Sequence, residues 1–224
     1  MKLTAVSFSY KQREILHDLS LKIQPGAVCG IAGHNGAGKT TLLRLMAGIL
    51  KPTSGNIEKS PNDSVSYLPE RAGLYDELTV AQNIKVSGML SGMTRRDAEN
   101  IIDTELKKWH LTEQKHSLVK QLSTGQRQRV GFICASFIPA TLVLCDEPTL
   151  GVDAYTRELV EQEISSMREN GKTIILVSHD LEFIRHICTQ FVVINDGQIV
   201  HDSQLGPDDH IEELYLQLTR EDAE

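Results

Sequence analysis

The stretch GHNGAGKTT at residues 33–41 constrains this chain more than any other part of its sequence. It fits the pattern G-x-x-x-x-G-K-[ST] of a glycine-rich loop that binds phosphate groups. The loop follows an apolar run of strand length, AVCGIA at 27–32, and precedes TLLRLMAGIL at 41–50, whose apolar spacing is helical. Because this motif joins a buried strand to a helix, it predicts an α/β fold, a P-loop NTPase core with a mainly parallel sheet.

The residues of this loop have separate chemical tasks. Gly33, Gly36 and Gly38 let the backbone curl so that its amides face phosphate oxygens. Lys39 is expected to reach the terminal phosphates, and Thr40 to supply a hydroxyl to Mg²⁺. The alternative is a glycine-rich turn with a chance lysine. The complete predicted cofactor loop is Gly33, His34, Asn35, Gly36, Ala37, Gly38, Lys39, Thr40 and Thr41.

Two further apolar runs end in polar residues. LVLCDEP at 142–148 contains Asp146, placed to hold the Mg²⁺ shell, and Glu147, which could orient a water as general base. ILVSHD at 175–180 contains His179, whose imidazole could contact a terminal phosphate or hold the attacking water. A solvated acidic turn and a structural histidine are the respective alternatives. The predicted catalytic set is Glu147, His179 and Lys39.

The pattern changes along the chain. LTAVSFSY and LHDLSLKI alternate polar and apolar residues at period two, which predicts an N-terminal antiparallel β portion. TVAQNIKVSGML at 79–90 and TRRDAENIIDTELKKWHL at 94–111 have helical spacing and predict an inserted α-helical lobe. FVVINDGQIVHDS predicts a hairpin that turns at Asp196–Gly197, followed by a short helical tail.

These patterns predict a single domain over residues 1–224. Its nucleotide-binding core is expected at 1–75 and 121–205, its helical lobe at about 76–120, and its C-terminal tail at 206–224.

Composition excludes several classes of protein. No apolar run approaches the roughly 20 residues of a bilayer span, and the first residues are typical of a strand rather than a signal peptide, so we expect a cytoplasmic location. A net charge of −7 disfavours nucleic acid as a partner. Cys29, Cys134, Cys145 and Cys188 are scattered without a C-x-x-C pair, which predicts reduced core thiols.

A second helix start is also suited to anions. In QLSTGQRQRV at 121–130, Ser123 and Gly125 place a hydroxyl and uncovered amides where a helix begins. A capped helix without a ligand is the alternative. Two such starts in one chain of this size call for an explanation.

Five motifs in order supply that explanation: GHNGAGKTT, LSTGQRQRV, LVLCDEP, GVD at 151–153 and SHD at 178–180. Together they resemble the nucleotide-binding domain of ABC ATPases along nearly the whole chain. In that family two domains meet head to tail around two ATP molecules. The resemblance therefore implies ATP and Mg²⁺ as cofactors and a second ATPase subunit as partner, with a homodimer permitted. It implies that Ser123, Gly125 and Gln126 bind ATP in the partner's site.

Other assignments depend on the same resemblance. Tyr10 matches the aromatic residue that stacks on adenine, with packing alone as the alternative, and Asp153 lies in the segment that crosses the dimer interface. Glu70 stands where the family usually has Gln, and its carboxylate can ligate Mg²⁺ or its water. Thr124 and Val152 replace the commoner Gly and Leu. Since both acids of CDE are present, the resemblance implies an active ATPase.

The family resemblance favours the ATP-hydrolysing subunit of an ABC transporter. It implies a separate integral membrane permease subunit as partner and a peripheral location on the inner face of the membrane. LPE, GLYDELTV and EELYLQLT look like ATPases of ABC-2-type exporters, which favours export. The alternative is a soluble single-cassette ABC ATPase, such as an iron–sulfur assembly or clamp ATPase. A nucleotide-binding module without turnover is disfavoured by Lys39, Asp146, Glu147 and His179.

Overall fold

The computed structural model describes residues 1–60, 63–206 and 209–220. Within this part of the chain, six strands form one sheet in the order β5-β6-β7-β3-β8-β9, and three form an antiparallel sheet in the order β2-β1-β4. The first sheet is parallel except for β9, which pairs antiparallel with β8. The strands are β1 Lys2–Tyr10, β2 Arg13–Lys22, β3 Val28–Ala32, β4 Ser54–Glu58, β5 Val65–Leu68, β6 Leu142–Asp146, β7 Thr173–Val177, β8 Gln190–Asn195 and β9 Gln198–Gln204.

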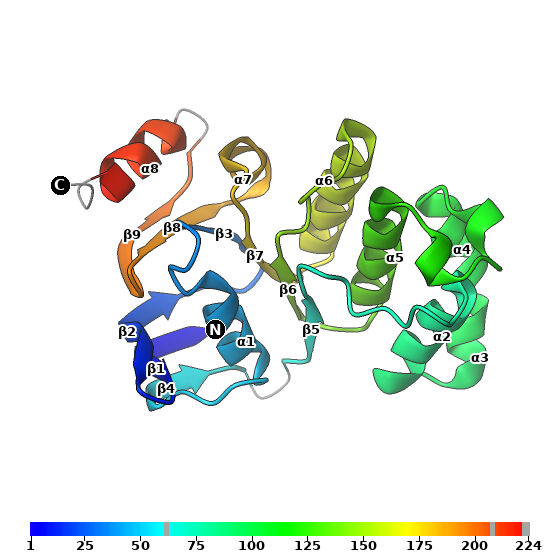
Figure 1. Cartoon of the computed structure of the whole chain (residues 1–224), viewed down its shortest axis with the longest axis horizontal. Coiled ribbons are helices and arrows are strands. Elements are labelled where there is room, and N and C mark those ends of the chain that lie inside the picture. Colours follow the sequence, from blue (N-terminus) through cyan, green and yellow to red (C-terminus); the bar gives the residue numbers. More distant parts are fainter. Residues whose placement is uncertain (61–62, 207–208, 221–224) are drawn as a thin grey trace.

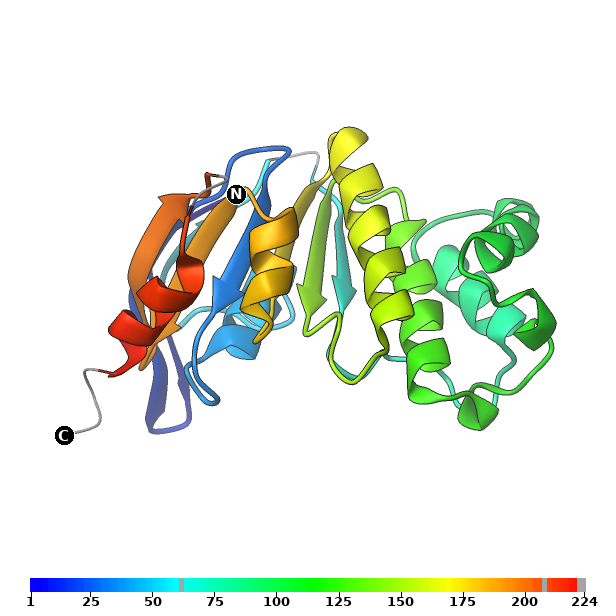
Figure 2. The same ribbon diagram turned by 90° about the horizontal axis from the view of Figure 1, so that it is seen from above.

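Helices lie on both faces of the larger sheet and beyond one end of it (Figure 1 and Figure 2). They are α1 Lys39–Ala47, α2 Val80–Leu90, α3 Arg95–Asn100, α4 Ile102–Lys108, α5 Thr124–Ser136, α6 Ala154–Glu169, α7 Leu181–Ile187 and α8 Ile211–Arg220, with short 3-10 turns η1 Thr112–Gln114 and η2 Val119–Gln121. In Figure 1, α1 and the three-stranded sheet lie together at one end of the molecule, and α2, α3 and α4 lie at the other. Figure 2 shows α5 and α6 between the sheet and these three helices.

The core residues alternate between two layers because successive strand residues point to opposite faces. In β3, Val28 and Ala32 pack with α5, α6 and α7 residues, whereas Cys29 and Ile31 pack with α1 and the smaller sheet. This double burial explains why the central strands are continuous apolar runs rather than alternating ones. The predicted mainly parallel sheet, N-terminal antiparallel portion and hairpin are confirmed.

The second helical pattern is divided. It forms α3 and α4, separated at Ile101, whose amide bonds Glu99 O instead of continuing the helical ladder. The break leaves Ala98, Ile102 and Leu106 buried on the inner side, while Ile101 is only half-buried. The lobe is joined to α5 by an aromatic contact between Trp109 and Phe132, whose ring centroids are 5.5 Å apart.

The structure bears on the prediction of reduced core thiols and on the expected absence of a membrane span. All four cysteines are free; Cys29, Cys145 and Cys188 are buried and Cys134 is half-buried. Burial raises the pKa of Cys134 and of Cys145 to about 12, so both thiols stay protonated near neutral pH. Among the described helices, none has both the length and the apolar character that crossing a bilayer requires.

Candidate functional site

One cavity of about 580 Å³ collects most of the residues predicted for phosphate and metal binding. It lies where the parallel strands β3, β6 and β7 end, the usual place for ligands in α/β sheets. The predicted residues that line it are Asn35, Gly36, Gly38, Lys39, Thr40, Thr41, Glu70, Asp146, Glu147 and His179.

The glycine-rich loop connects β3 to α1. Gly36 and Gly38 have φ angles of 91° and 101°, which favour glycine, and Gly38 is the residue that caps α1. At Gly33 a Cβ atom would lie 2.3 Å from the carbonyl oxygen of Ile194, so any side chain would push the loop away from β8. The loop backbone therefore faces the cavity uncovered at the start of a helix, where anions bind.

Lys39 is buried and turns back over the loop. Its Nζ donates hydrogen bonds to Gly33 O at 2.7 Å and to His34 O at 2.9 Å. The same atom lies 3.4 Å from Nε2 of His179. Burial lowers the pKa of Lys39, and Glu147 and Asp146 oppose that change by favouring the charged form. The ammonium group of Lys39 thus lines the cavity beside the imidazole of His179.

Asp146 ends β6 and is buried. Its Oδ1 accepts a hydrogen bond from the Thr40 hydroxyl at 3.2 Å, and its Oδ2 accepts one from the Tyr67 hydroxyl at 3.4 Å. Burial raises the pKa of Asp146, partly offset by the hydrogen bond from Thr40. Thr40 and Asp146 together present hydroxyl and carboxylate oxygens, the ligands that Mg²⁺ prefers.

A metal ion bound at Thr40 and Asp146 would need further ligands besides protein side chains. No group of three His, Cys, Asp or Glu residues that could hold a metal occurs in the described ranges. Mg²⁺ commonly takes one or two protein oxygens and completes its shell with water and phosphate oxygens. The pair Thr40 and Asp146 therefore fits a metal that arrives with a phosphate ligand.

Glu147 is held next to His179. The backbone amide of Glu147 donates to Val177 O at 2.9 Å, and Oε2 accepts from the amide of His179 at 3.2 Å. Nε2 of His179 lies 3.2 Å from Oε1 of Glu147. Burial raises the pKa of Glu147 to about 7, and it lowers the pKa of His179. Glu147 can therefore take up a proton near neutral pH, as a general base must.

Glu70 lies in the segment that follows β5. Its side chain is exposed and lines the cavity. Its charge raises the pKa of both Asp146 and Glu147. The cavity is thus lined by three carboxylates, those of Glu70, Asp146 and Glu147, together with Lys39 and the glycine-rich loop.

The cavity lining does not include Tyr10, the residue expected to stack on adenine. Tyr10 is exposed, packs edge-on against Phe8 with ring centroids 4.8 Å apart, and is not among the residues that line the cavity. Arg13 and Ile15 line it instead. Arg13 pairs with Tyr10 across the β1–β2 turn, so the hairpin pattern could have indicated it. Leu150 and Val177 also line the cavity and were missed, because only the tertiary structure brings them to this edge. Tyr67 was missed as a hydrogen-bond partner of Asp146.

The second helix start lies outside this cavity. Ser123 caps α5: its hydroxyl accepts from the amide of Gln126 at 3.3 Å, and the Gln126 side chain accepts from the Ser123 amide at 3.0 Å. Ser123 is exposed and Gly125 partly exposed. Asp153 caps α6, where its Oδ1 accepts from the amide of Thr156 at 2.7 Å. Ser123, Gly125 and Asp153 thus do not line the cavity of their own chain.

Comparisons with known proteins agree with this site. The family model described as ABC transporter matches residues 16–150. An uncharacterised ABC transporter ATP-binding protein of Methanocaldococcus jannaschii is 37% identical over 192 residues, covering 86% of this chain and 72% of that protein. The SkfA peptide export ATP-binding protein SkfE of Bacillus subtilis is 31% identical over 210 residues, covering 90% of this chain and 88% of that protein.

A solved structure has a similar chain fold. A dimeric post-hydrolysis state of an ATP-binding cassette, bound to ADP and Pi, superimposes with a TM-score of 0.82 at 26% identity and covers 92% of this chain and 98% of that one. The family model matches more than half of the 224 residues, and the 580 Å³ cavity of this chain is lined by the phosphate loop and by acids of the kind that ATP hydrolysis requires. The chain therefore belongs to the ABC transporter family, as an ATP-binding and ATP-hydrolysing subunit of a transporter.

Proposed function

We propose that the chain binds Mg-ATP in the 580 Å³ cavity and hydrolyses it in a head-to-tail dimer that drives a separate membrane permease, in the direction of export. The observation that carries the proposal is the convergence of Lys39, Asp146, Glu147 and His179 on one cavity. These residues come from three strand ends far apart in the sequence. A soluble clamp or assembly ATPase is not favoured, because the family model and the named relatives are transporter proteins.

The phosphates of ATP are assigned to the loop Gly33–Thr41. Its amides and Lys39 would receive the negative charge, as at other helix starts. Thr40 and Asp146 would hold Mg²⁺ with Glu70 close by, and the ion would neutralise charge on the phosphate oxygens. Tyr10 is assigned to the adenine at the rim of the site, since its exposed ring is free to stack.

Glu147 is assigned as the general base. Its carboxylate accepts the proton of the attacking water, and its raised pKa suits that task near neutral pH. His179 lies within hydrogen-bonding distance of Glu147 and beside Lys39, so its imidazole is placed between the base and the terminal phosphate. Lys39 supplies positive charge to the phosphate that is transferred.

The second half of each site is assigned to a second copy of the chain. Ser123, Gly125, Gln126 and Asp153 do not line the cavity of their own chain. The start of α5 is suited to bind a phosphate, and Asp153, which caps α6, is assigned to the dimer interface. A dimer would bring them over the partner's ATP. The related cassette bound to ADP and Pi is dimeric, which supports this assignment.

The remaining assignments concern the assembly. We assign residues 1–75 and 121–205 to the nucleotide-binding core, about 76–120 to the helical lobe and 206–224 to the C-terminal tail. The permease would hold the chain at the cytoplasmic face of the membrane. Export is supported by SkfE, a peptide export ATP-binding protein of which this chain covers 88%.

Glu147→Gln tests the proposed mechanism. Removing a general base costs roughly 10²–10⁴-fold in rate while ATP binding is kept, so the variant should accumulate as an ATP-bound dimer. ATPase assays and light scattering with Mg-ATP measure both effects. Glu169→Gln, at the exposed end of α6, is the matched control and should behave as the parent. Normal hydrolysis by Glu147→Gln would contradict the assignment of the base.

The same trapped protein tests the partner. Tagged Glu147→Gln, captured with Mg-ATP from detergent-solubilised cells of its source, should retain a polytopic membrane protein that Lys39→Ala does not retain. Reproducible enrichment of soluble proteins alone would contradict the transporter assignment.

A further inference from the structure

Two chain segments connect the helical lobe to the rest of the molecule, and they are joined to each other. Residues 69–79 lead from β5 to α2, and residues 115–123 lead from the lobe to α5. The amide of Val119 donates to Leu78 O, and the amide of Val80 donates to Ser117 O, both at 3.1 Å. Thr79 and Leu118 form an antiparallel bridge between them. The first segment begins next to Glu70 in the cavity, and the second ends at Ser123.

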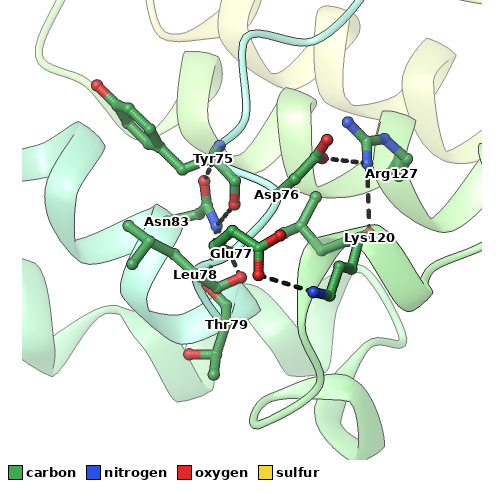
Figure 3. A network of polar contacts seen from close by, with 9 residues as sticks. Tyr75, Asp76, Glu77, Leu78, Thr79, Asn83, Lys120 and Arg127 are labelled. Carbon is green, nitrogen blue, oxygen red and sulfur yellow. Dashed lines mark hydrogen bonds and ion pairs between the residues drawn. The ribbon is translucent and has the colours of Figure 1, made fainter.

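Ion pairs reinforce this junction on its outer side (Figure 3). The guanidinium of Arg127 contacts Asp76 at 2.6 Å, and the ammonium of Lys120 contacts Glu77 at 2.7 Å. The same nitrogen of Arg127 donates to Val119 O at 3.4 Å. We call the pairs Asp76–Arg127 and Glu77–Lys120 the connector clasp.

Both ends of the clasp are anchored. On the lobe side the buried Asn83 accepts from the amide of Tyr75 at 2.8 Å and donates to Tyr75 O at 3.1 Å, which fixes the chain just before Asp76. On the other side Arg127 directly follows Gln126, which closes the capping box with Ser123. The clasp thus connects the chain next to Tyr75 with the first turn of α5, which begins after Ser123.

The position of Arg127 is unusual for a cation. It lies in the first turn of α5, where the helix dipole disfavours positive charge. Asp76 offsets that cost locally, and it keeps the guanidinium turned toward the lobe. An Arg that points away from the helix start leaves the amides of Thr124 and Gly125, which take no part in the capping box, open to an anion.

We propose that the connector clasp positions the start of α5 for the partner's ATP, with Arg127 as a positioning residue. This inference rests on the proposed head-to-tail dimer. Because the same segment begins at Glu70, the clasp joins a residue of the chain's own cavity to the residues offered to the partner's cavity. Neither Asp76 nor Arg127 lines the 580 Å³ cavity, so the effect proposed for the clasp is on the residues offered to the partner's site.

The expected size of the effect follows from the exposure of the pairs. Exposed ion pairs contribute about 0.2–1 kcal/mol, which corresponds to roughly 1.4- to 5-fold in an equilibrium constant. A symmetric dimer contains each clasp twice. Loss of one ion pair in both subunits should therefore weaken ATP-dependent dimerisation by roughly 2- to 25-fold.

The test uses the full chain with Glu147→Gln as parent. Adding Asp76→Asn should raise the dimer dissociation constant with Mg-ATP by that factor, while ATP binding to dilute monomer stays within about twofold. Asp76→Arg combined with Arg127→Asp should restore dimerisation. Glu99→Gln, which breaks the exposed lobe pairs of Glu99 with Lys85 and Arg95, is the matched control and should change neither constant.

A second measurement does not need the dimer. Hydrogen exchange of the amides at residues 121–127 in ATP-free monomer should be faster in Asp76→Asn than in Glu99→Gln. Unchanged exchange, or failure of the charge swap to restore dimerisation, would overturn the clasp. If the parent stays monomeric with Mg-ATP while exchange responds as expected, the clasp stands as a local positioning contact and the proposed dimer fails.

Discussion

Glu147 directly follows the end of β6 in a backbone conformation that is uncommon for glutamate. Its φ angle is 50°, a left-handed value that costs roughly 1–3 kcal/mol unless the surroundings hold it. The hydrogen bond from its amide to Val177 O supplies that hold. The turn directs the carboxylate to His179 instead of to Asp146, which separates the two acids of CDE into a predicted base and a predicted metal ligand.

The pH dependence of catalysis should depend on Glu70. Burial is the main cause of the raised pKa of Glu147, and the like charges of Asp146 and Glu70 add to it, so removing the charge of Glu70 should lower that pKa by a small part of the shift. A general base acts when deprotonated, so activity rises with pH through about 7, and the acid limb should move to lower pH in both Glu70→Gln and Glu70→Ala. Profiles of kcat/KM against pH measure this shift.

The two substitutions should differ in rate. Glu70→Gln keeps an oxygen that can ligate the metal or its water, so it should retain substantial ATPase activity, whereas Glu70→Ala should lose more. Equal losses would contradict a ligand role for Glu70. An unmoved acid limb would contradict the electrostatic coupling to Glu147.

At the scale of elements, α5 has two glycines with different surroundings. A Cβ at Gly131 would lie 2.5 Å from Cβ of Ala72, so α5 packs closely on the segment after Glu70. At Gly125 the nearest atom would be Thr156 Oγ1 at 3.5 Å, an ordinary contact. Packing within this chain thus requires glycine at position 131. At position 125, no atom of the described residues would lie within 3.4 Å of an added Cβ, so packing within the chain does not require glycine there.

Gly125→Ala should therefore separate stability from activity. Alanine is favoured over glycine in helices by about 1 kcal/mol, so the free energy of unfolding should stay equal or rise by up to that amount. ATPase activity should fall by roughly tenfold or more, because the methyl group would occupy the space of the partner's phosphate. Urea unfolding and ATPase assays measure the two effects.

Gly131→Ala is the control for this comparison. Overpacking against Ala72 should lower the free energy of unfolding by about 1–3 kcal/mol. Full activity in a stable Gly125→Ala protein would show that α5 begins with a cap and no ligand site.

At the scale of the whole molecule, we propose that each chain contributes one half to each of two shared sites. The cavity with Lys39 opens at the carboxyl ends of the parallel strands, and the helix start at Ser123 lies outside it. A second chain is the proposed source of the missing half.

Specific ATPase activity should therefore rise with protein concentration, because the chains must associate before they hydrolyse ATP. Mixing Lys39→Ala with Ser123→Ala should restore part of the activity that each lacks alone, since the mixed dimer contains one site with both intact halves. Steady-state ATPase assays over a dilution series measure both. Constant specific activity on dilution, or no recovery on mixing, would contradict the shared site.

The sequence predicted the site where the chemistry is local. The phosphate loop depends on glycines and a lysine within nine consecutive residues, and the helix start with Ser123 and Gly125 is equally local. Ile15 could not be predicted as a lining residue, because its place depends on how the smaller sheet packs on α1, whereas the pairing of Arg13 with Tyr10 could have indicated Arg13. The clasp of Asp76 and Arg127 joins residues 51 positions apart, and no motif contains both.

The sequence by itself determined the phosphate loop, the acids at the end of an apolar run, the helical lobe and the family, because these depend on backbone torsion angles and periodic spacing between near neighbours. Tertiary structure alone decided that Lys39, Asp146 and His179 meet. The strand order β6-β7-β3 places the ends of three distant segments side by side at one edge. It also decided the pKa of Glu147, since burial and the charges of residues far away in the sequence set it.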